Sequence, residues 1–202
     1  MHTFSGQLGS TVGYLKYGEN FERMLGGSKN PRNPRTEKQS AVRLKFLVLN
    51  QFAQKLSGIL KITMKSSVMP STSVFFKRNY DVIFGGSYPN FSLLYDKAIL
   101  STGGLDNPYS PNAVVESNVV TVSWTDNSGI GLAKKTDDAI VVAYNSVKSQ
   151  AIFTAEGGER STRQATLTLP SAWSGDSIDV WFAMRSKEGV LSDSIYLGNF
   201  SI

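Results

Sequence analysis

The side chains that most often carry out chemistry in proteins are scarce in this chain of 202 residues. The sequence contains no cysteine and one histidine, His2, beside the start of the chain. Zinc sites built on Cys and His, cysteine nucleophiles and His-based catalytic triads all need residues that the body of the chain lacks. We therefore expect no catalytic residues, no metal ligands and no cofactor.

Paired carboxylates are the remaining candidates for acid–base chemistry, because two nearby Asp or Glu side chains can act as general acid and general base. Outside one short turn, the close pairs are Asp137 with Asp138 and Asp176 with Asp179. They occur in predicted loops or at the starts of predicted strands, where acidic side chains are usually exposed to water. We therefore interpret them as solvated surface residues. The alternative, an enzyme, would need a deep pocket lined by these aspartates.

Three short segments resemble ligand-binding motifs only in part. Residues 126–129 (DNSG) begin like a calcium loop but lack the closing glutamate and the full set of oxygen ligands. Residues 129–134 (GIGLAK) start like a dinucleotide fingerprint, but Lys134 stands where the third glycine belongs. Residues 9–13 (GSTVG) are not followed by the Lys-Ser/Thr of a phosphate-binding loop. No small-molecule substrate is therefore evident from the sequence.

Charge is divided unevenly along the chain. Residues 1–90 contain 13 Lys and Arg against 4 Asp and Glu, a net charge of +9, whereas residues 91–202 contain 8 against 12, a net charge of −4. A basic half would suit nucleic acid or another polyanion. It would equally suit head-to-tail packing of copies, with the basic half of one against the acidic half of the next. An ordinary solvated surface is the third interpretation.

Five basic residues are the candidate contacts for such a partner. They are Lys29, Arg32, Arg35, Arg43 and Lys45. The first three belong to residues 26–35 (GGSKNPRNPR), a segment without an acid, in which two prolines exclude regular structure and predict an extended linker. These five side chains would contact a polyanion or a neighbouring subunit.

The first predicted element is a β-hairpin. Two runs that contain β-branched and aromatic residues, 11–17 and 21–25, are separated by a short turn. A lone hairpin is only marginally stable in water. This one therefore needs a partner, either the rest of the chain or a neighbouring copy.

The middle of the chain is predicted to be helical. A capping box at residues 36–39 precedes apolar residues at helical spacing, which predicts one or two helices over 36–66. Pro70 ends this region, and a second, shorter helix is expected after it. Gly85 and Gly86 would end that helix in a left-handed cap.

After a Gly- and Pro-rich stretch at 103–111, the sequence changes to short apolar runs separated by turns. The runs lie at 112–115, 119–124, 139–144, 151–155, 164–169, 178–184 and 194–198. Seven such strands predict an immunoglobulin-like sandwich with tryptophans in its core, and the absence of cysteine favours the fibronectin type III-like form. The predicted fold is therefore α+β, with an N-terminal β-hairpin and helices at 1–102 and an all-β sandwich domain at 103–202.

Four blocks of residues, in order over most of the chain, resemble one family. They are residues 33–39 (NPRTEKQ) with Arg43, Lys45 and Phe46 close behind, 86–92 (GSYPNFS), 122–129 (VSWTDNSG) and 168–176 (TLPSAWSGD). Together they resemble the family catalogued as domain of unknown function 6266, common in Bacteroidota. The resemblance implies no established activity and no catalytic residues. The Asn-Pro-Arg-Thr block before a helix is also similar to segments of some phage structural proteins.

No apolar run approaches the ~18 residues needed to span a bilayer, and the first residues lack the basic and apolar regions of a secretory signal. We therefore expect a cytoplasmic or particle-associated protein. The hairpin that needs a partner favours a non-enzymatic structural or assembly protein that forms homo-oligomers, phage-like or otherwise associated with a particle. The alternative hypothesis is a nucleic-acid-binding protein that uses the basic N-terminal half.

Overall fold

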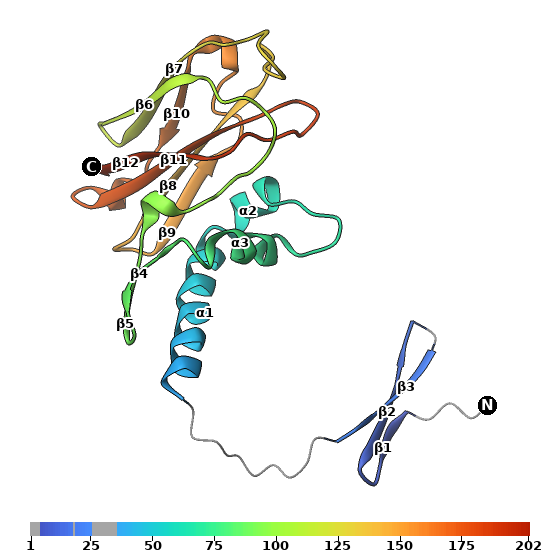
Figure 1. The fold of residues 1–202 in the computed structure, drawn as a ribbon. Coiled ribbons are helices and arrows are strands. Elements are labelled where there is room, and N and C mark those ends of the chain that lie inside the picture. Colours follow the sequence, from blue (N-terminus) through green and yellow to red (C-terminus); the bar gives the residue numbers. More distant parts are fainter. Residues whose placement is uncertain (1–4, 18, 26–35) are drawn as a thin grey trace. The chain divides into compact units, whose positions relative to one another are not determined.

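A computed structural model of the chain describes residues 5–17, 19–25 and 36–202, and Figure 1 shows its fold. The chain forms two compact units, residues 1–40 and 41–202. Helices and mostly antiparallel strands occupy separate stretches of the sequence, so the fold is α+β, as the sequence predicts.

The first unit contains a three-stranded antiparallel sheet with the order β1-β2-β3. Its strands are β1 (Gly6–Leu8), β2 (Thr11–Lys16) and β3 (Glu19–Met24). The predicted hairpin is confirmed as β2 and β3, which pair from Thr11 with Met24 to Lys16 with Glu19. The sequence did not indicate β1, because this strand is short and begins with a glycine. Gly9, with a φ of 58°, lies in the tight turn that leads the chain into β2.

Among the described residues, three α-helices follow: α1 (Glu37–Lys55), α2 (Ser57–Thr63) and α3 (Ser71–Asn79). The helical region expected over 36–66 is thus confirmed as two helices. Thr36 caps α1, because its side-chain oxygen accepts a hydrogen bond from the Gln39 N–H at 3.3 Å. Gly58 allows α2 to approach the sheet closely, since a Cβ atom there would lie 2.8 Å from the ring of Phe153.

A small hairpin, and not the end of a longer helix, follows α3. It consists of β4 (Phe84–Ser87) and β5 (Asn90–Leu93), and the 3-10 turn η1 (Tyr95–Lys97) comes next. The expected helix end at Gly85 and Gly86 is wrong, because both residues lie in β4. Gly86 has a φ of 76°, and a Cβ atom there would lie 2.5 Å from the carbonyl oxygen of Asn90. A glycine is therefore required by the hairpin at this position.

The remaining strands form two antiparallel sheets. The three-stranded sheet has the order β10-β7-β6 and contains β6 (Tyr109–Glu116), β7 (Val119–Thr125) and β10 (Gln164–Thr168). The four-stranded sheet has the order β12-β11-β8-β9 and contains β8 (Asp138–Asn145), β9 (Gln150–Thr154), β11 (Ser177–Arg185) and β12 (Ile195–Ser201). Two 3-10 turns, η2 (Arg160–Thr162) and η3 (Ser171–Trp173), flank β10. Each run that the sequence predicts as a strand in this region is a strand.

One hydrophobic core lies between these two sheets. Side chains from both meet in it, including Val122 of the three-stranded sheet and Val180 of the four-stranded sheet. Trp124 and Trp173 are buried there, as expected for core tryptophans. The Trp124 indole N–H donates a hydrogen bond to the carbonyl of Arg160 at 2.9 Å, so this ring is buried without leaving its polar atom unpaired.

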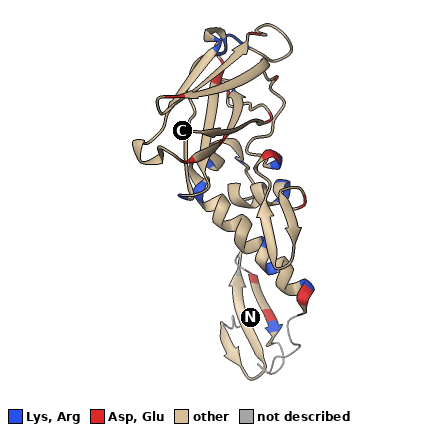
Figure 2. Ribbon diagram, turned by 90° about the vertical axis from the view of Figure 1, so that its left-hand side faces the viewer, with Lys and Arg blue, Asp and Glu red and all other residues tan. Residues whose placement is uncertain are grey.

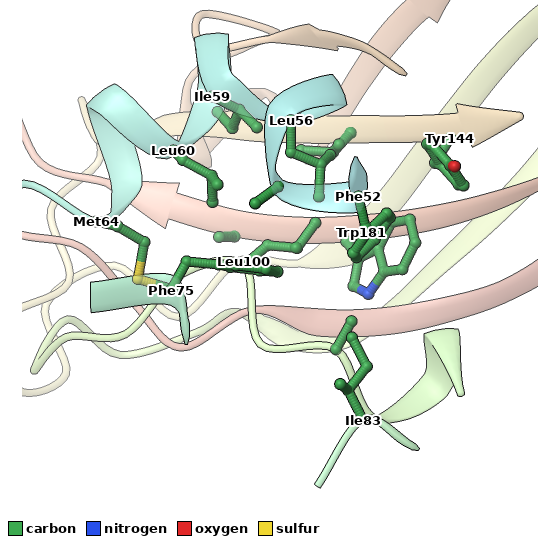
Figure 3. Close-up of a cluster of buried hydrophobic side chains, with 14 of the residues drawn as sticks. Phe52, Leu56, Ile59, Leu60, Met64, Phe75, Ile83, Leu100, Tyr144 and Trp181 are labelled. Atoms are coloured by element: carbon green, nitrogen blue, oxygen red, sulfur yellow. The ribbon is translucent and has the colours of Figure 1, made fainter. Parts of the chain in front are cut away.

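A second hydrophobic core lies on the opposite face of the four-stranded sheet, where the helices cover it (Figure 3). Along β8, Val141 belongs to the core between the sheets, whereas Ile140 and Val142 belong to the core under the helices. Successive side chains of a strand point to opposite faces, so β8 is buried at every position. Trp181 of β11 packs in the second core together with Phe52 of α1. Full burial of one such side chain stabilises a fold by about 1.5–3 kcal/mol.

The domain boundary expected at residue 103 stays a prediction. A fragment of the chain that begins at this residue tests it. Residues 103–202 keep the whole core between the sheets but lose the helices that cover Ile140, Val142 and Trp181. We expect this fragment to fold, to self-associate through the uncovered face, and to melt at least about 10 °C below a chain that starts at Thr36. Circular dichroism melts and gel filtration measure these properties. A fragment as stable and as monomeric as the longer chain would show that the helices do not stabilise the sheet.

Candidate functional site

The structure describes two of the five basic residues that the sequence singles out. Lys29, Arg32 and Arg35 lie outside the described residues. Arg43 and Lys45 both lie on α1, where Arg43 is exposed and Lys45 is half-buried. Contact of these residues with a polyanion or with another copy of the chain stays a prediction.

Lys45 lies among aromatic rings that include those of the β4–β5 hairpin. Its Nζ atom is 5.1 Å from the ring centres of both Phe84 and Phe91, and 5.8 Å from that of Tyr80. A cation over an aromatic ring is stabilised by about 0.5–1 kcal/mol at an exposed site. Lys45 therefore joins α1 to the hairpin, and part of its charge is engaged within its own unit.

The N-terminal half of α1 exposes a row of apolar side chains. Val42, Phe46 and Leu47 are 46%, 49% and 53% exposed, although Val42 and Phe46 continue the helical spacing of the buried Leu49 and Ala53. The ring of Phe46 nevertheless contacts two aromatic rings, stacking on Phe76 with the centres 5.7 Å apart and lying 5.0 Å from that of Tyr80. We name Val42, Arg43, Phe46 and Leu47 the α1 patch.

The α1 patch lies in a basic part of the chain. Residues 38–80 contain eight Lys and Arg and no Asp or Glu, and several of the basic positions lie along α1 (Figure 2). None of the ion pairs found among the described residues involves one of these eight side chains. The uncompensated charge gives this region a positive potential, which would favour an acidic or polyanionic partner over a basic one.

Both faces of the N-terminal sheet expose large apolar side chains. Leu8, Leu15 and Met24 share one face, because they stand at alternate positions in the strand register, and they are 71%, 54% and 77% exposed. We name this surface the Met24 face. On the other face, Tyr14 stacks on Phe21 with the ring centres 5.8 Å apart. Residues 5–25, as described, form only this sheet, so they provide no second layer to cover either face.

A buried ion pair links loops at one end of the two large sheets. Arg160 and Asp137 are both fully buried, and the Arg160 Nε lies 3.0 Å from the Asp137 Oδ2. The terminal guanidinium nitrogens donate to the side-chain oxygen of Asn127 at 2.6 Å and to the carbonyl of Asp106 at 2.8 Å. These hydrogen bonds connect four separate segments of the chain. The network therefore fixes the loops, because breaking any one contact would leave a buried polar group without a partner.

The expectation that the aspartate pairs are solvated is wrong for most of their members. Asp137, Asp138 and Asp179 are each 6% exposed or less. Asp138 accepts a hydrogen bond from the Lys187 ammonium at 2.8 Å, and Asp179 accepts one from the Tyr196 hydroxyl at 2.7 Å. Each of these carboxylates has its own partner, an arrangement that is typical of structural ion pairs and hydrogen bonds.

Tyrosines gather around the buried carboxylate of Asp179. Burial, followed by the neighbouring Tyr144 and Asp179, raises the pKa of the Tyr95 hydroxyl. Burial and the hydrogen bond to Asp179 likewise raise the pKa of Tyr196. Both hydroxyls therefore stay neutral at physiological pH, and the Tyr196 hydroxyl donates its hydrogen bond to Asp179. Sequence reasoning missed this cluster because its members come from four separate elements.

A groove of about 500 Å³ opens beside Tyr144, between α1 and the turn that joins β8 to β9. Its lining comprises Val48, Gln51, Phe52, Gln54, Lys55, Leu93, Tyr144 and Ser149. This set contains no Asp, Glu or His, so the groove holds hydrogen-bonding groups but no carboxylate or imidazole for acid–base chemistry at neutral pH.

Among the described residues, no group of three or more His, Cys, Asp or Glu side chains is arranged to hold a metal ion. None of the described helices is long and apolar enough to cross a membrane.

Comparison with known proteins places the chain in a family. Residues 3–198 match the family of unknown function DUF6266. Because the match covers nearly the whole chain, the chain belongs to this family, and the resemblance found from the four sequence blocks is confirmed. An origin in Bacteroidota stays a prediction. No curated protein matches the chain.

The contribution of the buried ion pair is testable by substitution. Arg160→Met leaves the buried carboxylate of Asp137 without its cation, and we expect a loss of about 3–5 kcal/mol in the free energy of unfolding. Arg163→Met alters an exposed arginine three residues away and should change the stability by less than about 0.5 kcal/mol. Urea denaturation at pH 7 measures both variants.

Adding Asp137→Leu to Arg160→Met should recover part of the lost stability, because no uncompensated charge then remains buried. If Arg160→Met were as stable as Arg163→Met, the ion pair would not stabilise the loops.

Proposed function

We propose that this chain is a non-enzymatic structural or assembly subunit that forms homo-oligomers, with the N-terminal sheet as its docking element. The observation that carries the proposal is the exposure of large apolar side chains on both faces of that sheet. Soluble monomers rarely expose such surfaces, and small sheets need a covering layer for stability. A second copy of the chain would provide that layer.

We also infer that residues 103–202 form an immunoglobulin-like sandwich of the fibronectin type III-like form. The strand order supports this: the first, second and fifth strands of the region form one sheet, and the third, fourth, sixth and seventh form the other. The shared core between the sheets is the expected packing for such a domain. This fold hosts many unrelated functions and does not by itself identify one.

The buried carboxylates support a role without catalysis. Asp137, Asp138 and Asp179 each have a partner for one carboxylate oxygen or more, namely Arg160, Lys187 and Tyr196, although the second oxygen of Asp137 is buried without one. A subunit of this kind would be cytoplasmic or particle-associated, with phage-like particles as one such assembly.

A second candidate function is nucleic-acid binding by the basic N-terminal half. The specific observation in its favour is the run of residues 38–80, which carries eight basic residues without an acid. The exposed Arg43 beside the aromatic ring of Phe46 would allow phosphate contact and base stacking together. Binding of this kind weakens steeply with salt.

Light scattering of the full-length chain at low and high salt tests the assembly. We expect a defined oligomer or a larger particle. Leu8→Thr combined with Met24→Thr should raise the dissociation constant at least about tenfold, because two apolar side chains would lose their burial at the interface. Val147→Thr is the matched control, since Val147 is 71% exposed in the turn after β8, and it should leave the mass unchanged.

A monomer at both salt concentrations would contradict the assembly. If such a monomer bound a single-stranded oligonucleotide with an affinity that fell steeply with salt, nucleic-acid binding would replace assembly as the function.

A further inference from the structure

We propose that the Met24 face of one copy docks on the α1 patch of a second copy, and that Glu22 of the sheet pairs with Arg43 of the helix. This inference rests on the proposed function, because it names the surface that the docking element would use. It follows from the match between two exposed surfaces that the same chain carries.

The Met24 face is apolar with one acidic position. In the strand register, the residues on this face are Gly6, Leu8, Thr11, Gly13, Leu15, Asn20, Glu22 and Met24. Glu22 is the only charged residue among them, and β3 is exposed along its whole length. Gly13 is paired with Glu22 across the strands and has no side chain. A partner that docks on this face would therefore meet one carboxylate on a surface that also carries the apolar Leu8, Leu15 and Met24.

The α1 patch carries a positive charge, that of Arg43, among exposed apolar side chains. Val42, Phe46 and Leu47 are half exposed, and the exposed Arg43 stands beside them. The one acid of α1 is Glu37, six residues before Arg43, and none of the ion pairs found among the described residues involves Arg43. A guanidinium ion offers several donors to a carboxylate, and this geometry makes Arg the preferred partner in interfaces.

The Met24 face belongs to a sheet and the α1 patch to a helix, two kinds of surface that commonly pack together. A sheet with an apolar face is stabilised by packing on the apolar stripe of a helix, which is a standard two-layer arrangement. The Met24 face lacks a second layer within the described residues 5–25, and the α1 patch is an apolar stripe that no described side chain fully covers. Complementary charge at the centre would fix the register of one layer on the other.

A second copy is the occupant that the two surfaces favour. Every copy carries both an apolar sheet face with one carboxylate, Glu22, and a helix surface with exposed apolar side chains and the exposed Arg43. The two surfaces of different copies are therefore complementary in charge and in apolar character. The contact joins two different surfaces, so it closes into a ring, forms a reciprocal dimer or continues as a filament.

Charge exchange across the contact is the decisive experiment. Glu22→Arg and Arg43→Glu each place like charges together, and each should raise the dissociation constant for self-association of the full-length chain at least about tenfold. The double variant, Glu22→Arg with Arg43→Glu, restores opposite charges and should return to within about threefold of the unmodified chain. Sedimentation velocity over a concentration series measures all of these constants.

Two matched controls separate this contact from a general effect of charge. Glu19→Arg makes the same change on the opposite face of β3, and Lys61→Glu makes the same reversal at an exposed position of α2. Both should alter the constant less than about threefold. Circular dichroism confirms that each variant keeps its fold.

Each other outcome overturns the inference in a distinguishable way. If the unmodified chain is monomeric, the assembly function fails and the docking contact fails with it. If the chain assembles but the two single variants behave like their controls, the assembly stands and uses another surface. If both single variants weaken assembly and the double variant does not restore it, Glu22 and Arg43 are not partners. If Arg43→Glu abolishes binding of a single-stranded oligonucleotide without changing the mass, the α1 patch binds nucleic acid.

Discussion

The burial of β8 and β11 on both faces is the constraint on which the rest of the structure depends. Every side chain of β8 is buried, and alternate positions enter two different cores, one between the sheets and one under the helices. A polar group on such a strand is stabilised by a hydrogen-bond partner, because an unpaired polar group inside costs several kcal/mol, roughly 2–7 depending on the reference. Asp179 and Asp138 have such partners in Tyr196 and Lys187, whereas the buried indole nitrogen of Trp181 on β11 has none.

The same constraint explains why the N-terminal half of α1 exposes apolar side chains. A helix of 19 residues such as α1 is about 28 Å long, and its buried residues, Leu49, Phe52 and Ala53, all lie in its C-terminal half. The part of α1 before Leu49 is supported by the contacts of Lys45 with the β4–β5 hairpin and of Phe46 with Phe76 and Tyr80. The α1 patch is therefore a consequence of how the helix is placed over the sheet, since its stripe continues where the core has ended.

Most of the helices and strands could be predicted, because they follow from the spacing of apolar residues close together in the sequence. The polar contacts between distant residues could not be predicted. The runs that became β6–β12 and the capping box before α1 depend on neighbouring residues, so a single sequence reveals them. The pairing of Arg160 with Asp137 depends on residues 23 apart, and nothing in the local sequence marks either one as buried. The five basic residues were chosen by charge alone, which cannot reveal that Lys45 lies over aromatic rings. The exposure of Val42 and Phe46 was hidden because these two residues follow the same helical spacing as the buried Leu49 and Ala53.

The N-terminal sheet raises a question of energy that the proposed partner would resolve. Ordering one residue costs about 1–2 kcal/mol of backbone entropy, and this sheet offsets that cost with hydrogen bonds between three short strands and one aromatic pair. Hydrogen bonds that replace bonds to water contribute only about 0.5–1.5 kcal/mol each. Burial of Leu8, Leu15 and Met24 would supply the missing hydrophobic term. Because a partner that binds only the ordered form stabilises it by mass action, order in this sheet and assembly of the chain would rise together with concentration.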